Sequence, residues 1–268
     1  MNEEAGDRIL QRLLEDVSRL ERLRSALIRR AYVPGSVAES DSRRPLGDHV
    51  PSQCLAALGV AIDHLEAWAD LWINGRQHPL FAHITLVRGA IEGAVRCLWI
   101  LDPDASQMER VARAAGTHLD DLVELEKAER ALAREAAGES PPATWPRGRG
   151  RPASERIAEL REELRRHGVD ARQSSITQLV ARYGSGELTY RLLSGVAHGK
   201  DWAVLLARRD QLVMDPDLNV VRMQVSGDPM WSAQMTGEAV RLLQQALGEL
   251  SVYFGSDPPS WPAPPAID

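Results

Sequence analysis

The fold is decided by LFAHITLVRGAIEGAVRCLWIL, residues 80–101, which is the most apolar stretch of the chain. Its length would suit a membrane span, but four polar side chains interrupt it: His83, Arg88, Glu92 and Arg96. Ionisable groups are expensive inside a bilayer, and a single span does not tolerate this many of them. The stretch therefore predicts a helix buried in the core of a globular protein, and no membrane partner.

The rest of the composition is that of an ordinary globular domain. Apolar residues make up 44% of the 268 and charged residues 26%, which allows a substantial core. The formal net charge of -6 argues against a protein that coats nucleic acid non-specifically. Cys54 and Cys97 fall inside apolar helical patterns, so we expect buried free thiols in a reducing cytoplasm. The acidic start, Met1 to Glu4, predicts no secretory signal.

Apolar residues recur with the period of an α-helix along most of the chain. In the first helical segment Leu13, Leu20 and Leu27 repeat every seven residues, which is close to a coiled-coil seam. Two interpretations of this segment stay open: an amphipathic helix packed on its own domain, or a coiled-coil contact between two copies. The helices that the periodicity predicts cover residues 3–32, 51–75, 80–102, 104–137, 154–167, 174–183, 186–198 and 229–254.

Segments of another kind separate and follow these helices. Residues 33–50 form a polar loop rich in breakers, and residues 138–153 form a linker of Pro, Gly and Arg. Two short apolar runs on either side of Asp215–Asn219 predict a β-hairpin. Five prolines make residues 255–268 unsuited to regular structure. We therefore predict an all-α fold: a helical bundle with a long N-terminal helix, one late β-hairpin and a disordered Pro-rich tail.

The clearest sign of chemistry is YRLLSGVAHGK, residues 190–200. With about 3.6 residues per turn, Arg191, Ser194 and His198 share one stripe of a helix, and Tyr190 lies beside it. A helix C-terminus favours an imidazolium, and a guanidinium can bind a phosphate through two parallel hydrogen bonds. The pair suits RNA cleavage, in which one residue moves the proton and the other holds the phosphate. In the alternative, His198 caps its own helix and Arg191 pairs with a carboxylate.

The core helix carries a second candidate set. Arg88 and Glu92 are four residues apart, and a charged stripe on an apolar helix must find partners because unpaired buried charge is costly. They form either a buried ion pair or part of the cavity that His198 faces. His64, on the neighbouring helix, could face the same cavity. We therefore predict binding residues around the pair Arg191 and His198, namely Tyr190, Ser194, Arg88, Glu92 and His64.

The Arg-x6-His spacing, late in a helical bundle, resembles the R-x(4–6)-H signature of the HEPN superfamily. Those proteins are small all-α domains, often dimeric, and many are metal-independent ribonucleases of defence and toxin systems. The resemblance implies that Arg191 contacts phosphate and that His198 is the catalytic acid or base. It also implies RNA or a nucleotide as partner, a homodimer, and a site that uses neither a metal nor a cofactor.

The resemblance spans residues 51–254, with an internal linker. This leaves an N-terminal helix and loop at residues 1–50 and a tail at residues 255–268. Leu192 departs from the family pattern, since the residue after the Arg is commonly polar there. The polar residues of the core helix, taken with the later motif, also look like an uncharacterised group of bacterial helical proteins. The alternative function is a non-catalytic helical module that binds a nucleotide, a small ligand or a protein partner.

Two further motifs point to other chemistry. Asp120, Asp121 and Glu124 match the DDxxE part of an isoprenoid-diphosphate magnesium site, but no second acidic motif has suitable spacing. RGRP at residues 149–152 resembles the core of an AT-hook, but one hook binds weakly, so we predict a solvated linker instead of a contact to DNA. No metal-ligand cluster, glycine-rich phosphate loop or nucleophile motif is visible, so we predict neither a metal nor a cofactor.

Overall fold

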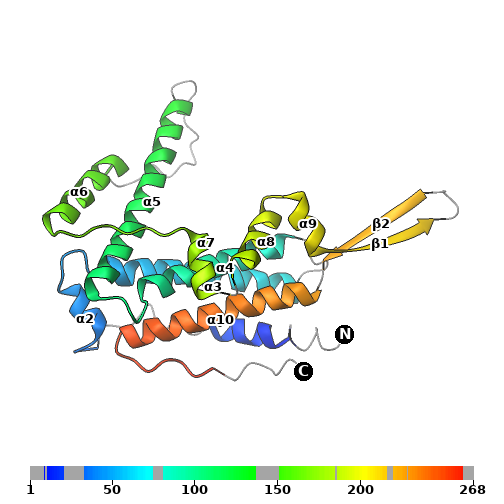
Figure 1. The fold of residues 1–268 in the computed structure, drawn as a ribbon, viewed down its shortest axis with the longest axis horizontal. Helices are drawn as coiled ribbons and strands as arrows, with labels where there is room; N and C mark the ends of the chain where they lie inside the picture. Colours follow the sequence, from blue (N-terminus) through cyan, green and yellow to red (C-terminus); the bar gives the residue numbers. More distant parts are fainter. Residues whose placement is uncertain are drawn as a thin grey trace.

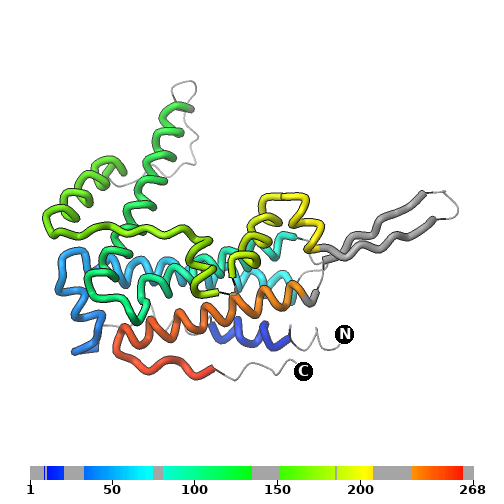
Figure 2. The backbone as a smooth tube through the Cα atoms, in the orientation of Figure 1, coloured from blue at the N-terminus to red at the C-terminus, as the bar shows by residue number. Residues whose placement is uncertain are grey.

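The structure is a computed structural model that describes residues 9, 11–20, 33–74, 81–136, 151–184, 186–215, 220–227 and 229–261. Side chains are described for all of these except residues 135–136 and 208–230. Figure 1 shows the arrangement, and Figure 2 shows the same backbone as a tube. The elements are α2 Val37–Ser42, α3 His49–Asn74, α4 Ala82–Ile100, α5 Gln107–Ala136, α6 Ala153–Arg166, α7 Ile176–Tyr183, α8 Glu187–Ala197, α9 Asp201–Ala207, β1 Arg208–Asp215, β2 Val220–Gly227 and α10 Pro229–Tyr253.

Helix α4 lies at the centre of the bundle (Figure 1). It packs against α3 and α10, and it also contacts α7 and α8. Most of its side chains are buried, among them Ile84, Ile91 and Ile100, which are at most 2% exposed. A helix that is apolar on nearly all sides belongs inside a protein, where neighbouring helices cover each face. The prediction of a core helix is therefore confirmed, and α4 is two residues shorter at each end than predicted.

The close approach of α3 to α4 depends on a glycine. A Cβ atom added at Gly93 of α4 would lie 2.4 Å from the Ala57 carbonyl oxygen and 2.9 Å from the Ala61 Cβ atom, both on α3. No side-chain rotation can relieve a clash with a backbone oxygen. Gly93 is thus required by packing, although glycine itself weakens a helix.

Gly93→Ala is therefore expected to lower the free energy of unfolding by roughly 1–3 kcal/mol, because the two helices must move apart. Gly59→Ala is the matched control, since a Cβ atom there meets nothing within 4 Å. It replaces a glycine inside α3 and should raise the free energy of unfolding by about 0.5–1 kcal/mol. Urea denaturation of both variants measures the difference. Equal stability of the two would contradict the packing argument.

Part of the N-terminal helix is described. Residues 11–20 are helical, and Leu13, Val17 and Leu20 are buried in the main core. This supports the interpretation of an amphipathic helix packed on its own domain. Leu27 and most of the remaining residues of the predicted helix lie outside the described residues.

The prediction of a loop over residues 33–50 is corrected, because this segment contains the short helix α2. The Ser36 hydroxyl accepts the Glu39 N–H (3.1 Å), and the Glu39 carboxylate accepts the Gly35 N–H (2.7 Å). These two bonds satisfy donors that a helix N-terminus leaves free. A helix of six residues is too short to show periodicity, which is why the sequence pattern missed it. The seven-residue helix α9 was missed for the same reason.

The fold prediction is right in its helical class and is corrected at the hairpin. Among residues whose side chains are described, every regular element is a helix. The backbones of β1 and β2 pair antiparallel, with Leu212 opposite Met223. A two-stranded hairpin has too little surface to form a core of its own.

The prediction of a disordered tail over residues 255–268 is also corrected in part. Residues 255–261 are described, and Trp261 is half-buried against the core. The Ser256 N–H also donates to the Ser251 carbonyl (2.8 Å). Prolines exclude helix and interior strand, but an extended chain can still bury a large aromatic side chain, and burial of that area is favourable. The rest of the predicted tail, residues 262–268, lies outside the described residues.

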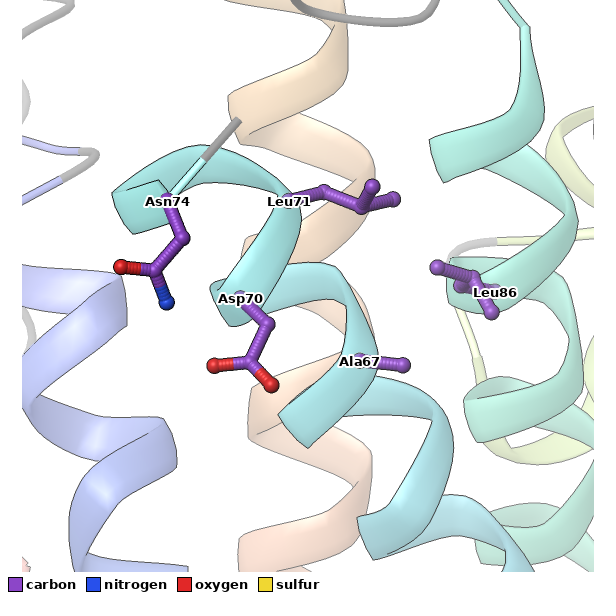
Figure 3. A pocket seen from close by; sticks show the side chains of 5 residues that line it. All are labelled: Ala67, Asp70, Leu71, Asn74 and Leu86. Atoms are coloured by element: carbon purple, nitrogen blue, oxygen red, sulfur yellow. The ribbon is translucent and has the colours of Figure 1, made fainter. Parts of the chain in front are cut away.

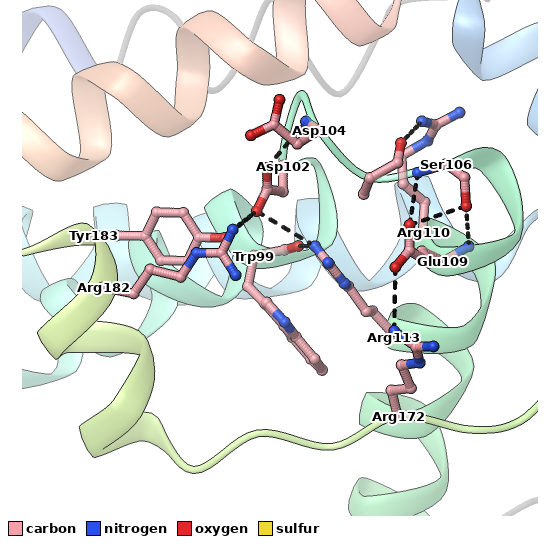
Figure 4. Close-up of polar contacts among 11 residues, drawn as sticks. Trp99, Asp102, Asp104, Ser106, Glu109, Arg110, Arg113, Arg172, Arg182 and Tyr183 are labelled. Atoms are coloured by element: carbon pink, nitrogen blue, oxygen red, sulfur yellow. Dashed lines mark hydrogen bonds and ion pairs between the residues drawn. The ribbon is translucent and has the colours of Figure 1, made fainter.

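A buried carboxylate joins α4, α5 and α7 (Figure 4). Asp102, which is 4% exposed, follows α4 and accepts the Tyr183 hydroxyl (2.7 Å) and the Arg182 guanidinium (2.6 Å). It also lies 3.6 Å from the guanidinium of Arg113, which donates to the Trp99 carbonyl (2.6 Å). Helix α7, which this network holds, contacts α8, the helix that carries the predicted site residues.

Candidate functional site

The end of α8 places His198 at the tip of the helix. Gly199 has a φ of 63°, in the left-handed region that favours glycine. The N–H groups of Gly199 and Lys200 donate back to carbonyls of the last turn (3.0 and 2.8 Å), which completes a Schellman-type ending. Gly199, which follows His198 in the sequence, therefore ends the helix, and the His198 side chain is exposed to solvent.

Four side chains meet where α8 packs on α4, and we call them the Arg88 cluster: Arg88, Glu92, Tyr190 and His198. Arg88 Nε donates to Glu92 Oε1 (2.7 Å), and Arg88 Nη2 donates to Tyr190 Oη (3.4 Å). Tyr190 Oη in turn donates to the same Glu92 oxygen (2.8 Å). Arg88 Nη1 lies 3.2 Å from His198 Nε2. The predicted binding residues Arg88, Glu92 and Tyr190 thus come together with His198.

Burial and charge fix the protonation of the inner part of the cluster. Burial would lower the pKa of Arg88, but the Glu92 carboxylate and the Tyr190 hydroxyl outweigh it and raise that pKa. Burial, followed by the hydrogen bond to Glu92, raises the pKa of Tyr190 to about 12. Arg88 is therefore a guanidinium and Tyr190 a neutral phenol at neutral pH. Both hold positions set by the Glu92 carboxylate.

The contact between Arg88 and His198 selects one form of the imidazole. A guanidinium can only donate hydrogen bonds, so Nε2 of His198 acts as the acceptor and the ring proton lies on Nδ1. His198 lies at the exposed edge of the cluster. The geometry places a fixed cation and a proton acceptor within 3.2 Å of each other, facing solvent.

The other predicted residues of α8 lie elsewhere on its surface. Arg191 is 63% exposed and forms an ion pair with Glu187, one turn earlier (2.6 Å). Ser194 is half-buried on the face between Tyr190 and Arg191. Arg191 therefore shares the stripe of His198, as helical spacing requires, but its described interaction is with Glu187. Arg88 is the cation in direct contact with the imidazole.

His64 lies on the other side of α4. Its Nδ1 donates to the Val60 carbonyl (2.8 Å), one turn earlier in α3. Its ring packs over Gly89, where an added Cβ atom would lie 2.5 Å from the ring carbon Cδ2. His64 thus fills the contact between α3 and α4 at Gly89, which follows Arg88 in the sequence but lies on a different face of α4.

A shallow pocket of about 450 Å³ lies between the end of α3 and the start of α4 (Figure 3). Its lining mixes apolar side chains with two polar ones: Ala67, Leu71, Leu86, Asp70 and Asn74. The only charged group in this lining is a carboxylate, which repels phosphate. None of the Arg88 cluster lines this pocket, so the two lie at different places on the surface.

The acidic motif of α5 lies on its surface. Asp120 and Asp121 are exposed, and Glu124 forms an ion pair with Lys127 (2.6 Å). In the described part of the chain, no group of three or more His, Cys, Asp or Glu side chains is placed to hold a metal ion. Arg151 of the predicted linker pairs with Glu155 and Glu159 of α6, and the start of the RGRP motif lies outside the described residues.

Two further findings limit the range of functions. The described helices include none with the length and hydropathy that a membrane span requires. Cys54 and Cys97 are both buried and free, as predicted. Comparison of the chain with family models, with curated proteins and with solved structures finds no match.

Proposed function

We propose that the chain is a HEPN-like protein that cleaves RNA without a metal ion, with His198 and Arg88 at its reactive centre. The proposal rests on one observation: the guanidinium of Arg88, which is partly buried, lies 3.2 Å from the exposed imidazole of His198. Arg88 takes the phosphate-binding role that the resemblance assigned to Arg191. A bacterial cytoplasm and a role in defence or toxin systems belong to the same proposal.

The chemistry needs one proton acceptor and one fixed cation. When substrate binds, Arg88 Nη1 turns from His198 Nε2 to the phosphate, and the freed Nε2 lone pair removes the proton of a ribose 2′-hydroxyl, whose oxygen then attacks the adjacent phosphorus. The bond from phosphorus to the 5′ oxygen breaks, which leaves a 2′,3′-cyclic phosphate and a 5′-hydroxyl. Arg88 stabilises the negative charge on the phosphoryl oxygens. Glu92 and Tyr190 are positioning residues, since they hold the guanidinium.

The leaving 5′ oxygen must also gain a proton. We propose that it comes from water or from the imidazolium of a second copy, because the resemblance implies a homodimer. A non-catalytic module that binds a nucleotide is the second candidate. The same cation and imidazole can hold a phosphate without any proton transfer, so the two candidates differ in cleavage and not in binding.

The direct test is to incubate the protein with single-stranded RNA in the presence of EDTA, which removes metal ions. The wild-type protein is expected to cut it and to leave 2′,3′-cyclic phosphate ends, because the 2′-oxygen is the nucleophile. The same sequence with every 2′-hydroxyl methylated should bind and stay intact. Gel analysis of labelled strands, with end-group identification, gives the readout. Cleavage of the methylated strand, or cleavage only with added magnesium, would contradict this mechanism. Binding of both strands without any cleavage would favour the non-catalytic candidate.

A further inference from the structure

Two imidazole rings lie against each other where α5 contacts the start of α3. The ring centroids of His49, in the first turn of α3, and His118 of α5 are 4.7 Å apart, and the ring planes are inclined by 28°. Both residues are half-buried. Gln53 Nε2, one turn later in α3, donates to His118 Nδ1 (3.3 Å), because an amide nitrogen can only donate. An imidazolium carries a proton on both nitrogens, so this hydrogen bond exists only while His118 is neutral.

The stacked pair lies at the base of an arm. Before His118, α5 is tied to the rest of the bundle by the ion pair of Arg110 with the buried Asp41 (2.9 Å). The second half of α5 stands away from the bundle and packs against α6 (Figure 1). We call residues 119–136 together with α6 the α5–α6 arm. His118 thus stands where the anchored part of α5 ends and the arm begins.

Burial holds the ring of His49 in its neutral form. Burial and then the adjacent His118 ring lower the pKa of His49, and they outweigh the carboxylates of Asp48 and Glu163, which would raise it. Asp48 precedes α3, whereas Glu163 lies near the end of α6, so part of this environment comes from the arm. His49 is therefore uncharged at neutral pH in the observed packing.

His118 is uncharged for related reasons. Burial and then the guanidinium of Arg156, on α6, lower its pKa and outweigh the nearby Asp121, which would raise it. Arg96 of α4 and His118 both favour the ionised form of Asp121, but burial raises the pKa of that carboxyl. If both rings were protonated, two cationic rings would lie with centroids 4.7 Å apart, beside Arg156. Like charges at that distance repel, and partial burial weakens the screening by water.

We propose that the stacked pair of His49 and His118 is a pH-sensitive joint, which keeps the α5–α6 arm closed on the bundle at neutral pH and lets it open in mild acid. The inference goes beyond the proposed function, because it concerns a movement of helices and not the chemistry of the Arg88 cluster. When the arm opens, the rings separate and each can bind a proton in water. A histidine whose pKa is lowered by a contact supports that contact above its free pKa of about 6.5, and the support is lost as the pH falls below this value.

The size of the effect follows from this proton uptake. At pH 5.5 a free imidazole with a pKa of about 6.5 is protonated about ten times more often than not. Each ring that is neutral in the closed arm therefore shifts the equilibrium toward the open arm by up to about 10-fold between pH 7.5 and pH 5.5. The two rings together shift it by up to about 100-fold.

Hydrogen–deuterium exchange of the full chain, followed by mass spectrometry at pH 7.5 and pH 5.5, measures the opening. Each rate is divided by the intrinsic exchange rate at the same pH, so that the ratio reports opening alone. Peptides from α6 and from the second half of α5 should lose roughly 10- to 100-fold of their protection at pH 5.5, whereas peptides from α4 and α10 should keep theirs. Unchanged protection of the arm would overturn the inference. Equal loss in α4 and α10 would also overturn it, because the pair would then support the whole fold and not a joint.

Variants of the two rings show whether the histidines cause the effect. The double variant His49→Phe with His118→Phe keeps two rings in contact and removes both titrating groups, so its arm should be equally protected at both pH values. His118→Gln is a milder change that leaves one titrating ring, and its loss of protection should not exceed about 10-fold. His167→Ala is the matched control, because it removes an exposed histidine at the end of α6 and should keep the wild-type loss. A loss as large as that of the wild type in either ring variant would rule the joint out.

Discussion

Replacing His198 by alanine is expected to lower the rate of RNA cleavage by about 10²–10⁴-fold, which is the usual contribution of one general acid–base group. The imidazole is the group that lies next to Arg88 Nη1 (3.2 Å). Stability should change little, because the side chain is exposed and the backbone N–H keeps its bond to the Ser194 carbonyl (3.1 Å). Initial rates in EDTA and the melting temperature measure the two effects.

The chain offers a matched control for this substitution. His167 also caps a helix, α6, is also exposed, and is also followed by a glycine with a φ of 63°. His167→Ala therefore repeats the loss of an exposed imidazole at a helix C-terminus, but not the loss of a contact with Arg88. It should leave the cleavage rate unchanged. If His198→Ala and His167→Ala both cut RNA at the wild-type rate, His198 does not move the proton and the proposed mechanism is excluded.

The same assay decides which arginine holds the phosphate. Arg88→Lys keeps the charge but loses the planar fork that reaches Glu92, Tyr190 and His198 together. Arg191→Lys makes the same exchange at an exposed ion pair, where lysine can replace arginine. We expect a much larger fall in rate for Arg88→Lys. The reverse order would return the phosphate-binding role to Arg191.

The helices themselves were predictable because their apolar patterns are local. Residues 80–101 are apolar on almost every side of a helix, so the position of α4 in the core follows from its own sequence. The end of α8 was predictable for the same reason, since Gly199 alone ends the helix after His198. Features that depend on neighbouring residues in the chain can be deduced from a single sequence.

The sequence placed Arg88 among the binding residues around His198, but it could not show that Arg88, and not Arg191, contacts the imidazole. Arg88 and His198 are 110 residues apart, and only the packing of α8 on α4 brings them together. Sequence spacing pointed to Arg191 because it lies on the same stripe. A long exposed side chain, however, pairs with the nearest carboxylate on its helix, and for Arg191 this is Glu187 four residues earlier.

Asp102 is a third feature that the sequence conceals. The sequence Asp102-Pro103-Asp104 predicts a helix boundary and gives no sign of a buried carboxylate. The structure shows that its carboxylate joins three helices through residues that follow it by up to 81 positions. Asp102→Asn is therefore expected to lower the free energy of unfolding by about 3–5 kcal/mol. The loss comes mainly from Arg113, which is 8% exposed and would be left without its counter-charge.

Arg182 contributes less to this loss, since its side chain is 54% exposed and solvent screens its pair with Asp102. Asp104→Asn is the matched control, because Asp104 is exposed and reaches Asp102 only through its backbone N–H (3.0 Å). It should leave stability within the error of urea denaturation. Equal stability of the two variants at pH 7 would mean that the buried carboxylate contributes no net stability.

The effect of Asp102→Asn should also depend on pH. Burial alone would raise the pKa of Asp102, but the hydrogen bonds from Tyr183 and the Asp104 N–H, and then the charges of Arg182 and Arg113, hold it below its ordinary value. A carboxylate whose pKa is lowered by folding contributes stability above its unfolded pKa of about 3.9, and this is lost as the pH falls through the folded value. The stability gap between wild type and Asp102→Asn should therefore be full at pH 7 and narrow below about pH 4, because a protonated carboxyl resembles the amide. Urea denaturation of both proteins at pH 7 and pH 3 measures the gap. A gap that stays constant would mean that the shape of the side chain, and not its ionised form, holds the three helices together.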